Sequence, residues 1–406
     1  MASEIIVENL NVTMQKVMDK LGVKSYKIQI DGKSEIGDNY MGEVIFFTIF
    51  SADDKRVYNF VMKGAKSSEK LRSITPVEVV YKRESFIYTE VFPYFQKFID
   101  EKNPNFEFDC VPKLYWVDRS PRKETLIFDN LKTKGFKLHD RKQPWNLEHS
   151  LLAMKYYGKF HALSFALRDQ KPEVFKNFNK NLPNLFEDFS RIIKINQIYE
   201  EPFKNVKELL QKAGRNDLVN KLEFWSENLS SIFENLADEN DKLVICHADC
   251  WNNNFMFTYQ NNEDASPSKM AFLDFQLSIV DTPVYDLAYN IYATCDKSCL
   301  DHFDLLLETY YKSLSSSIRN LGSNPDELFT YEQLKQHWQK YSHIGIIISI
   351  VIIKLELLDK ADAPDMAKLT EDGENVDDYL NVKVRNQEEY NRRILEIFTH
   401  YGDIVN

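Results

Sequence analysis

Three polar side chains near the ends of short apolar runs have the chemistry of a phosphoryl-transfer site. Asp249 and Asn254 lie in a polar loop between the apolar run 243–245 and a second apolar run that begins at Phe255, and Asp274 ends a third apolar run at 270–273. Two short strands with a turn between them would bring the three side chains to one end of a small sheet. Two carboxylates and an amide around one point supply hard oxygen ligands for Mg²⁺ and an acid that orients a hydroxyl. The rest of the chain must then supply the other parts of such a site.

Other residues of this stretch have more than one interpretation. His247 could act as a base, but a histidine at the close of an apolar strand is more often packed and hydrogen-bonded, and we favour that structural role. Asp249 is the better acid because a loop position lets its carboxylate stay ionised. Trp251 either lines an acceptor pocket or anchors the loop. Asp286 opens a predicted helix, where we expect a cap or a hydrogen bond to the loop.

Phosphoryl transfer from ATP also needs backbone amides that surround the phosphates and a cation that contacts them. Gly37 and Gly42 flank a turn between two predicted strands, where backbone amides can cover phosphates. The signal is weak alone, since glycines in turns are usually only turns and no Walker pattern follows Gly42. Lys63 ends the next strand, and Glu84 lies on the following helix. A lysine at the end of a strand is more often exposed to solvent. An acid such as Glu84 that holds Lys63 inward would make the two residues together a stronger indication of a phosphate-binding site than either alone.

The elements that position these residues fall into two groups. Apolar periodicity predicts a helix at 4–21, a helix from Thr75 through Glu84 towards Pro93, and strands at 25–30, 44–50, 57–63, 111–117 and 125–128. Beyond residue 131 it predicts mainly helices, interrupted by three short strands around the Asp249 loop. The helices are expected from Asn146 to Leu163, twice within 202–238, and at 283–294, 298–320, 331–358 and 385–402. Residues 261–268 are predicted as a polar hairpin loop and 359–384 as an acidic, mobile segment.

The composition is that of a globular protein. The 406 residues suffice for two lobes with a sizeable core, and the net charge of −11 disfavours wholesale binding to nucleic acid or to an anionic membrane. The apolar run 344–353 is too short to span a bilayer and is predicted to be a buried helix. The N-terminus has no basic stretch followed by a long apolar run, which predicts a cytoplasmic protein without a signal peptide. We expect no obligate protein partner.

The five cysteines form an odd, sparse set, which is typical of reduced thiols. Cys246, His247, Asp249 and Cys250 cluster, so we considered zinc. Cys246 and His247 are adjacent, and no CxxC spacing is present, which argues against a zinc site.

Together these motifs resemble the small-molecule branch of the protein-kinase-like fold, which includes choline kinases and aminoglycoside phosphotransferases. Within that branch the chain most resembles the insect ecdysteroid-kinase-like family, over roughly residues 30 to 350. The stretches that carry the resemblance are His247-x-Asp249, Trp251-Asn252-Asn253-Asn254, Asp274-Phe275-Gln276, Tyr285-Asp286-Leu287-Ala288, Glu84-Ser85-Phe86-Ile87-Tyr88, Asp129-Asn130-Leu131 before Gly135-Phe136, and Lys159-Phe160-His161-Ala162.

The resemblance implies a bilobal α+β fold. A strand-rich N-lobe would occupy residues 1–130 and cover the nucleotide. A mainly helical C-lobe would occupy 131–406 and carry the catalytic loop 247–254. The implied activity is ATP-dependent and Mg²⁺-dependent phosphorylation of a hydroxyl on a small, fairly apolar molecule such as an ecdysteroid or another steroid or xenobiotic alcohol.

The resemblance also implies a role for each matching residue. Asp249 would orient the acceptor hydroxyl and receive its proton, while Asn254 and Asp274 would hold Mg²⁺. Lys63 would contact the α- and β-phosphates, positioned by Glu84. The remaining nucleotide contacts would come from the loop between Gly37 and Gly42 and from the backbone of Phe128, Asp129, Asn130 and Leu131, which would join the lobes and hydrogen-bond adenine.

The chain departs from the family pattern without losing a catalytic group. Ala248 stands where glycine is usual, Cys250 replaces a typically apolar residue, Asn252 adds polarity, and Asp129 stands where glutamate is more usual. An active kinase is therefore expected. The alternative is a catalytically silent kinase-like protein that binds a hydrophobic small molecule. A metal hydrolase built on His247 and Asp249 would need more histidines than the loop offers.

Overall fold

The computed structural model describes residues 2–34, 42–66, 69–73, 75–190, 194–234, 237, 242–260, 266–359 and 384–405. Gly37, most of the predicted 261–268 loop and nearly all of the predicted acidic segment 359–384 lie outside these residues. No helix in the described ranges has the length and apolar character needed to cross a membrane.

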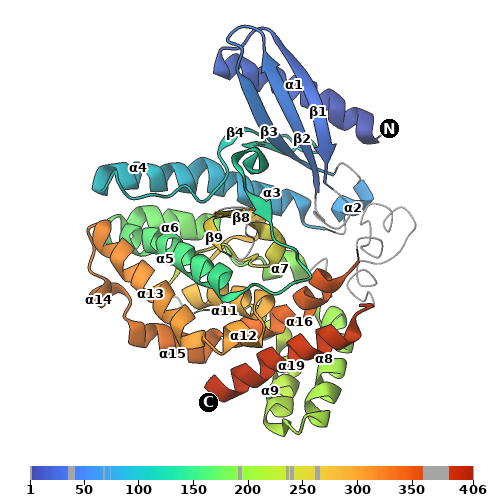
Figure 1. Ribbon diagram of the computed structural model, residues 1–406, viewed down its shortest axis with the longest axis vertical. Helices are drawn as coiled ribbons and strands as arrows, with labels where there is room; N and C mark the ends of the chain where they lie inside the picture. Colours follow the sequence, from blue (N-terminus) through green and yellow to red (C-terminus); the bar gives the residue numbers. More distant parts are fainter. Residues whose placement is uncertain are drawn as a thin grey trace.

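The N-terminal part of the chain folds around one antiparallel sheet of five strands. Its order is β1-β2-β3-β5-β4, and it stands apart from most of the helices (Figure 1). Lys63 lies on the central strand, opposite Val44 on one neighbour and Leu126 on the other, two residues before that strand ends. The strands are β1 (Tyr26–Lys33), β2 (Gly42–Ser51), β3 (Val57–Ala65), β4 (Leu114–Asp118) and β5 (Thr125–Asp129).

Alternation along the strands gives this sheet two apolar faces. Helix α1 (Ala2–Leu21) covers one face, where Met14 packs with Phe47 and Phe60. The other face meets the helical segment that carries Glu84, through contacts that include Leu126. Successive strand residues point to opposite faces, so Lys63 faces away from its buried neighbour Met62.

The segment that carries Glu84 is longer than its sequence predicts. Helix α3 (Val77–Phe86) begins after Pro76 and continues through a π-helical turn (Ile87–Val91) into α4 (Phe92–Lys102). The expected stop near Pro93 is therefore wrong. Proline lacks an N–H, but the N–H of Phe92 bonds to the Ile87 carbonyl, and Pro93 falls in the first turn of the new α-helical segment, where proline is tolerated. A short α2 (Glu69–Ser73) precedes the segment.

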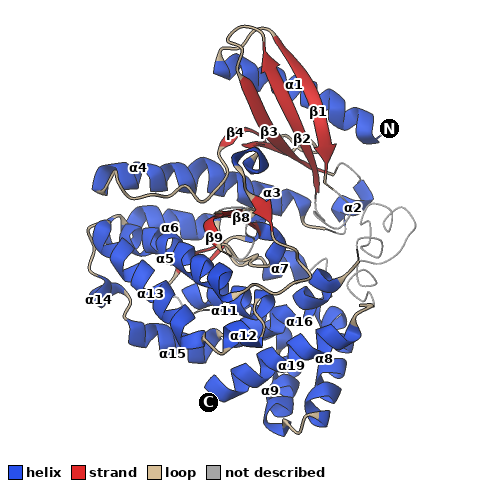
Figure 2. Cartoon of the chain, in the orientation of Figure 1, coloured by secondary structure: helices blue, strands red, loops and turns tan. Residues whose placement is uncertain are grey.

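Helices dominate the remainder, as predicted (Figure 2). The segments expected at 298–320 and 331–358 are each divided into two helices, with breaks near residues 301–302 and at Ser342. The helices are α5 (Leu147–Gln170), α6 (Pro172–Asn181), α7 (Phe186–Ser190), α8 (Ile195–Lys212), α9 (Asn216–Glu227), α10 (Leu229–Glu234), α11 (Pro283–Thr294), α12 (Lys297–Leu300), α13 (Phe303–Asn320), α14 (Pro325–Leu328), α15 (Tyr331–Tyr341), α16 (His343–Leu357) and α19 (Gln387–Ile404).

The apolar run 344–353 is a buried helix, as expected. It forms most of α16, which packs against α11. At the crossing, a Cβ on Gly345 would lie 2.4 Å from the Ala288 carbonyl carbon, so only glycine allows this close approach.

The short strands around the Asp249 loop belong to two sheets. Strand β7 (Val244–Cys246) pairs with β10 (Ile279–Asp281). Strand β8 (Phe255–Tyr259) pairs with β9 (Pro267–Phe272) and with β6 (Lys137–Leu138). The expectation of one small sheet is thus wrong, because the loop at 247–254 crosses from one sheet to the other. The overall arrangement, a strand-rich lobe followed by a mainly helical lobe, confirms the bilobal α+β class.

Candidate functional site

The 247–254 loop is held by a buried carboxylate at the start of α11. Asp286 accepts hydrogen bonds from the backbone N–H of His247 at 2.7 Å and of Ala248 at 2.8 Å. Burial alone would raise the pKa of Asp286, but hydrogen bonding from His161 and the charge interactions around it lower the pKa below its usual value. Ala248 has φ 64°, a left-handed conformation that disfavours a side chain. The Asp286 contacts hold the alanine there, at the position where the family usually has glycine.

His247 supports the loop, as the sequence predicts. Its Nε2 lies 2.7 Å from the Leu273 carbonyl oxygen, and its Nδ1 accepts a hydrogen bond from the backbone N–H of Asp249 at 3.2 Å. These two bonds fix the tautomer with the proton on Nε2. Burial lowers the pKa of His247. The neutral ring therefore ties the Asp249 loop to the residue preceding Asp274.

Asp249 is buried and accepts hydrogen bonds from two neighbouring side chains. The side-chain amide of Asn254 donates to its Oδ2 at 2.8 Å and to its backbone carbonyl at 2.9 Å, and the Tyr289 hydroxyl donates to Oδ1 at 3.4 Å. Burial, reinforced by the nearby charge of Asp274, raises the pKa of Asp249 to about 7. The expectation that a loop position keeps this carboxylate ionised is therefore wrong, because the loop buries it. A carboxylate with such a pKa is suited to take a proton near neutral pH.

Asn254 and Asp274 both line the cavity between the sheet and the helical lobe, and both side chains carry oxygen atoms. Since Asn254 uses its NH₂ group on Asp249, its carbonyl oxygen is the atom left for a ligand. Asp274 has φ 62°, and its Oδ1 lies 2.6 Å from the Lys63 Nζ. Amide and carboxylate oxygens form the kind of donor set that Mg²⁺ takes.

Lys63 is held inward by two acids. Its ammonium lies 2.7 Å from Glu84 Oε2 and 2.6 Å from Asp274 Oδ1, and both Lys63 and Glu84 are buried. Burial alone would lower the pKa of Lys63, but the two carboxylates outweigh it and raise the pKa to about 12. The sequence-predicted pair is therefore formed, and it includes Asp274 as a third member.

The side chains at the end of β5 and just after it form hydrogen bonds within the protein. Asp129 Oδ1 accepts the backbone N–H of Lys113 at 2.6 Å, and its other oxygen pairs with Lys134. Asn130 accepts the backbone N–H of Lys132 at 3.0 Å through its side chain. These contacts shape the connection between the lobes and leave recognition of a ligand there to the backbone.

One cavity of about 840 Å³ opens between the sheet and the helical lobe, within the usual size range of small-ligand pockets. Apolar side chains such as Val44, Phe46 and Met256 line its walls. Asp249 does not line the cavity, but its hydrogen-bond partner Asn254 does. Gly42 does not line the cavity either. The lining includes Lys63, Glu84, Phe128, Asp129, Asn130, Leu131, Asn254 and Asp274.

The absence of a side chain at Gly42 lets neighbouring groups lie close to its backbone. A Cβ there would lie 2.2 Å from the Tyr81 hydroxyl and 2.8 Å from the Gly64 carbonyl oxygen. We expect Gly42→Ala to displace the start of β2 and to weaken nucleotide binding, measured by titration calorimetry. Gly42→Ala/Tyr81→Phe should recover part of the affinity, because it removes the shorter contact. Full affinity in the single variant would contradict this account.

A buried network on the far side of the loop was not predicted. Asn252 accepts a hydrogen bond from Trp145 Nε1 at 3.1 Å, and its backbone N–H donates to Glu356 at 3.3 Å. Arg393 on α19 lies 3.0 Å from the other Glu356 oxygen. The one sign of this network in the sequence is Glu356, an acid near the end of an apolar helix. Trp251, also buried, fits the interpretation of a loop anchor.

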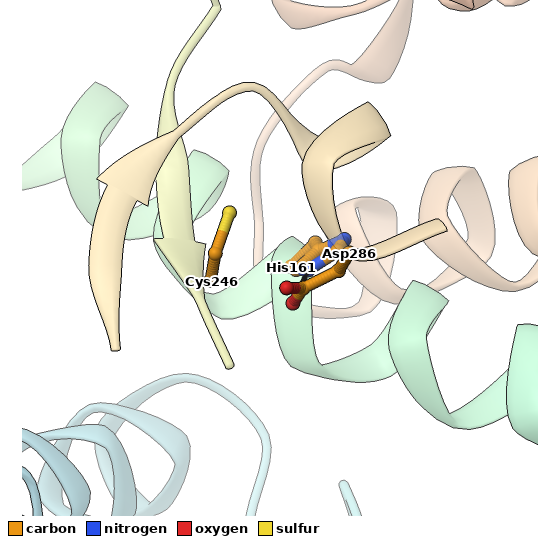
Figure 3. Close-up of side chains that lie close together, drawn as sticks. All are labelled: His161, Cys246 and Asp286. Carbon is orange, nitrogen blue, oxygen red and sulfur yellow. Dashed lines mark hydrogen bonds and ion pairs between the residues drawn. The ribbon is translucent and has the colours of Figure 1, made fainter. Parts of the chain in front are cut away.

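The described residues contain one cluster with metal-binding groups, formed by His161, Cys246 and Asp286, whose ligand atoms lie within 4.8 Å of one another (Figure 3). Each side chain has a hydrogen-bond partner: His161 Nδ1 lies 3.0 Å from the Tyr310 hydroxyl, its Nε2 bonds to Asp286, and Cys246 donates to the Thr282 carbonyl. We interpret the cluster as support for the loop. Cys250 also bonds to Asp286, at 3.2 Å.

Comparisons with known proteins place this site in context. Aminoglycoside 2'-phosphotransferase-IIIa, as a variant in its GDP complex, is 12% identical to the chain with a TM-score of 0.40, over 97% of this chain and 98% of its own. The AMP-bound complex of spectinomycin phosphotransferase is 11% identical with a TM-score of 0.37, over 96% and 94%. No curated protein sequence matches the chain. Residues 36–323, more than half of the chain, match the model of one family, and this range includes strands β2 to β5, the 247–254 loop and Asp274. The chain therefore belongs to the ecdysteroid kinase-like family.

Proposed function

We propose that this protein is an ATP-dependent phosphotransferase that phosphorylates a hydroxyl of a small hydrophobic molecule. Membership of the ecdysteroid kinase-like family supports a small-molecule kinase of the protein-kinase-like fold. The observation that carries the proposal is the linked set of Lys63, Glu84, Asp274, Asn254 and Asp249 around and beside one cavity. The family description favours an ecdysteroid, or another steroid or xenobiotic alcohol, as acceptor.

We assign residues 1–130 to an N-lobe and 131–406 to a C-lobe. The connection after β5 would join them, and the backbone of Phe128 to Leu131 would hydrogen-bond adenine. The phosphates would then lie toward Lys63, under the loop that Gly37 and Gly42 flank. Leu131 and Asp274 both line the cavity, and its volume of about 840 Å³ suits a nucleotide.

Each polar residue has a role that its contacts support. Mg²⁺–ATP supplies the phosphoryl group together with the charge that neutralises the phosphates. The oxygens of Asn254 and Asp274 suit the metal, and the Lys63 ammonium suits the phosphates. Asp249 orients the acceptor hydroxyl and takes its proton, while Asn254 and Tyr289 fix the carboxylate in place. Chemistry of this kind depends mainly on positioning and electrostatics.

The test measures binding and turnover separately. We expect the wild type to bind ATP more tightly with Mg²⁺ than without it, measured by calorimetry, and to phosphorylate members of an alcohol panel, detected by mass spectrometry. Asp274→Asn should remove the effect of Mg²⁺ on binding, because it removes a charged oxygen ligand. Asp301→Asn, at an exposed site on the helical lobe, serves as the control.

The outcomes separate the two interpretations of the fold. Absence of Mg²⁺–ATP binding in the wild type would favour a silent protein that binds a hydrophobic molecule. An undiminished Mg²⁺ effect in Asp274→Asn would contradict the metal assignment. Binding without transfer to any alcohol would leave the nucleotide site in place and reject the proposed acceptors.

A further inference from the structure

Tyr88 presents a hydroxyl that the proposed mechanism does not use. It lies one helical turn after Glu84, in the π-helical segment Ile87–Val91, and it lines the cavity. The side chain is 5% exposed, and its hydroxyl has no hydrogen-bond partner among the residues that the structure describes. Buried polar groups in proteins are nearly always hydrogen-bonded, so an exception at the wall of a cavity points to a ligand.

The Tyr88 ring is fixed on three sides by other aromatic rings. Its centroid lies 4.8 Å from that of Phe128, 5.1 Å from Phe92 and 5.9 Å from Phe275. Packing of this kind leaves the ring little freedom to turn its hydroxyl toward another partner. The π-helical turn contributes to this placement, and such turns are frequent at functional sites.

The neighbours of Tyr88 select the part of a nucleotide that it would meet. Phe128 is the first residue of the proposed adenine-binding backbone, so the Tyr88 ring, which packs on Phe128, lies toward the base. Burial, reinforced by the charges of Glu84, Asp274 and Asp129, raises the pKa of Tyr88, which keeps the hydroxyl protonated and able to donate. The same carboxylates disfavour an anionic group at this hydroxyl.

We propose that the Tyr88 hydroxyl donates a hydrogen bond to N7 of the purine base and so contributes to nucleotide recognition. With the Watson–Crick edge against the backbone of Asp129 to Leu131, the N7 edge of the base faces the Phe128 side. The inference rests on the proposed nucleotide site, and it adds a side-chain contact to recognition that would otherwise depend on backbone groups.

The first test compares two tyrosines. Tyr88→Phe keeps the ring and removes the hydroxyl, and we expect Mg²⁺–ATP affinity, measured by calorimetry, to fall about tenfold. Tyr292→Phe is the matched control, since Tyr292 is fully buried on α11 and does not line the cavity. Its affinity should equal that of the wild type. Equal affinity of Tyr88→Phe and wild type would overturn the proposal.

The second test changes the ligand instead of the protein. Wild type should bind 7-deaza-ATP, which lacks N7, more weakly than ATP, and Tyr88→Phe should bind 7-deaza-ATP as well as it binds ATP. If wild type binds 7-deaza-ATP like ATP, or if the penalty for 7-deaza-ATP persists in Tyr88→Phe, Tyr88 does not contact the base. A wild type that binds no Mg²⁺–ATP would instead reject the nucleotide site itself.

Discussion

Replacing Asp249 with asparagine is expected to lower kcat by about 10²–10⁴-fold, the range typical for loss of a positioned general base. Asparagine has nearly the same shape and can still bond to Asn254 and Tyr289, which contact the carboxylate in the wild type. It cannot take the proton of an acceptor hydroxyl. The change therefore removes proton acceptance and the negative charge, and leaves the loop in place.

Binding and turnover must be measured together for this variant. Mg²⁺–ATP affinity should stay close to the wild-type value, because Asp249 does not line the cavity and would not contact the nucleotide. Asp109→Asn, at an exposed aspartate that pairs with Lys269, is the control for the same chemical change. Retention of wild-type kcat by Asp249→Asn would reject Asp249 as the base.

Local sequence patterns predicted much of the site because each group sits at the end of its own strand or helix. The pairing of Lys63 with Glu84 follows from a strand and the next helix packing together, and the support of the loop by Asp286 follows from a helix start. The pairing of strands that are distant in the sequence is harder to predict from such patterns. The strand before His247 was expected beside the one after Asn254, yet it pairs with Ile279–Asp281, because alternation identifies strands without identifying their partners.

The same limit explains what the sequence did not reveal. The sequence assigns no separate role to Tyr88, since that role depends on the rings packed around it. The contact of Tyr289 with Asp249 depends on how α11 crosses the loop. Pro93 predicted a helix end because its effect on an α-helix is local, whereas the π-helical turn that accommodates it is stabilised by packing.

Arg393→Met should lower the free energy of unfolding by about 3–5 kcal/mol at pH 8, the usual cost of removing one partner of a buried ion pair. Arg393 and Glu356 have no exposed side-chain surface, and their oxygen and nitrogen lie 3.0 Å apart. Glu356 also accepts the backbone N–H of Asn252, so its carboxylate links the C-terminal helices to the Asp249 loop. Without the guanidinium, an ionised Glu356 would be buried without its counter-charge.

The size of this effect should depend on pH. Burial raises the pKa of Glu356 from 4.5 to about 7, although Arg393 opposes the rise. Between these values the folded protein holds a proton that the unfolded chain releases, so this group's contribution to stability declines as pH rises through the window. Removing Arg393 raises the folded pKa further and extends the decline above pH 7. The variant should therefore lose less stability at pH 5 than at pH 8.

Two controls isolate the charge. Arg392→Met changes the neighbouring arginine, which pairs with Glu389 and Glu396 at a partly exposed site, and should cost at most about 1 kcal/mol. Arg393→Met/Glu356→Gln removes the titrating group and should lose the extra dependence on pH. Denaturant unfolding at pH 5 and pH 8 measures all three variants. A cost of Arg393→Met that is equal at both pH values would mean that packing of the arginine, and not its charge, stabilises this side of the loop.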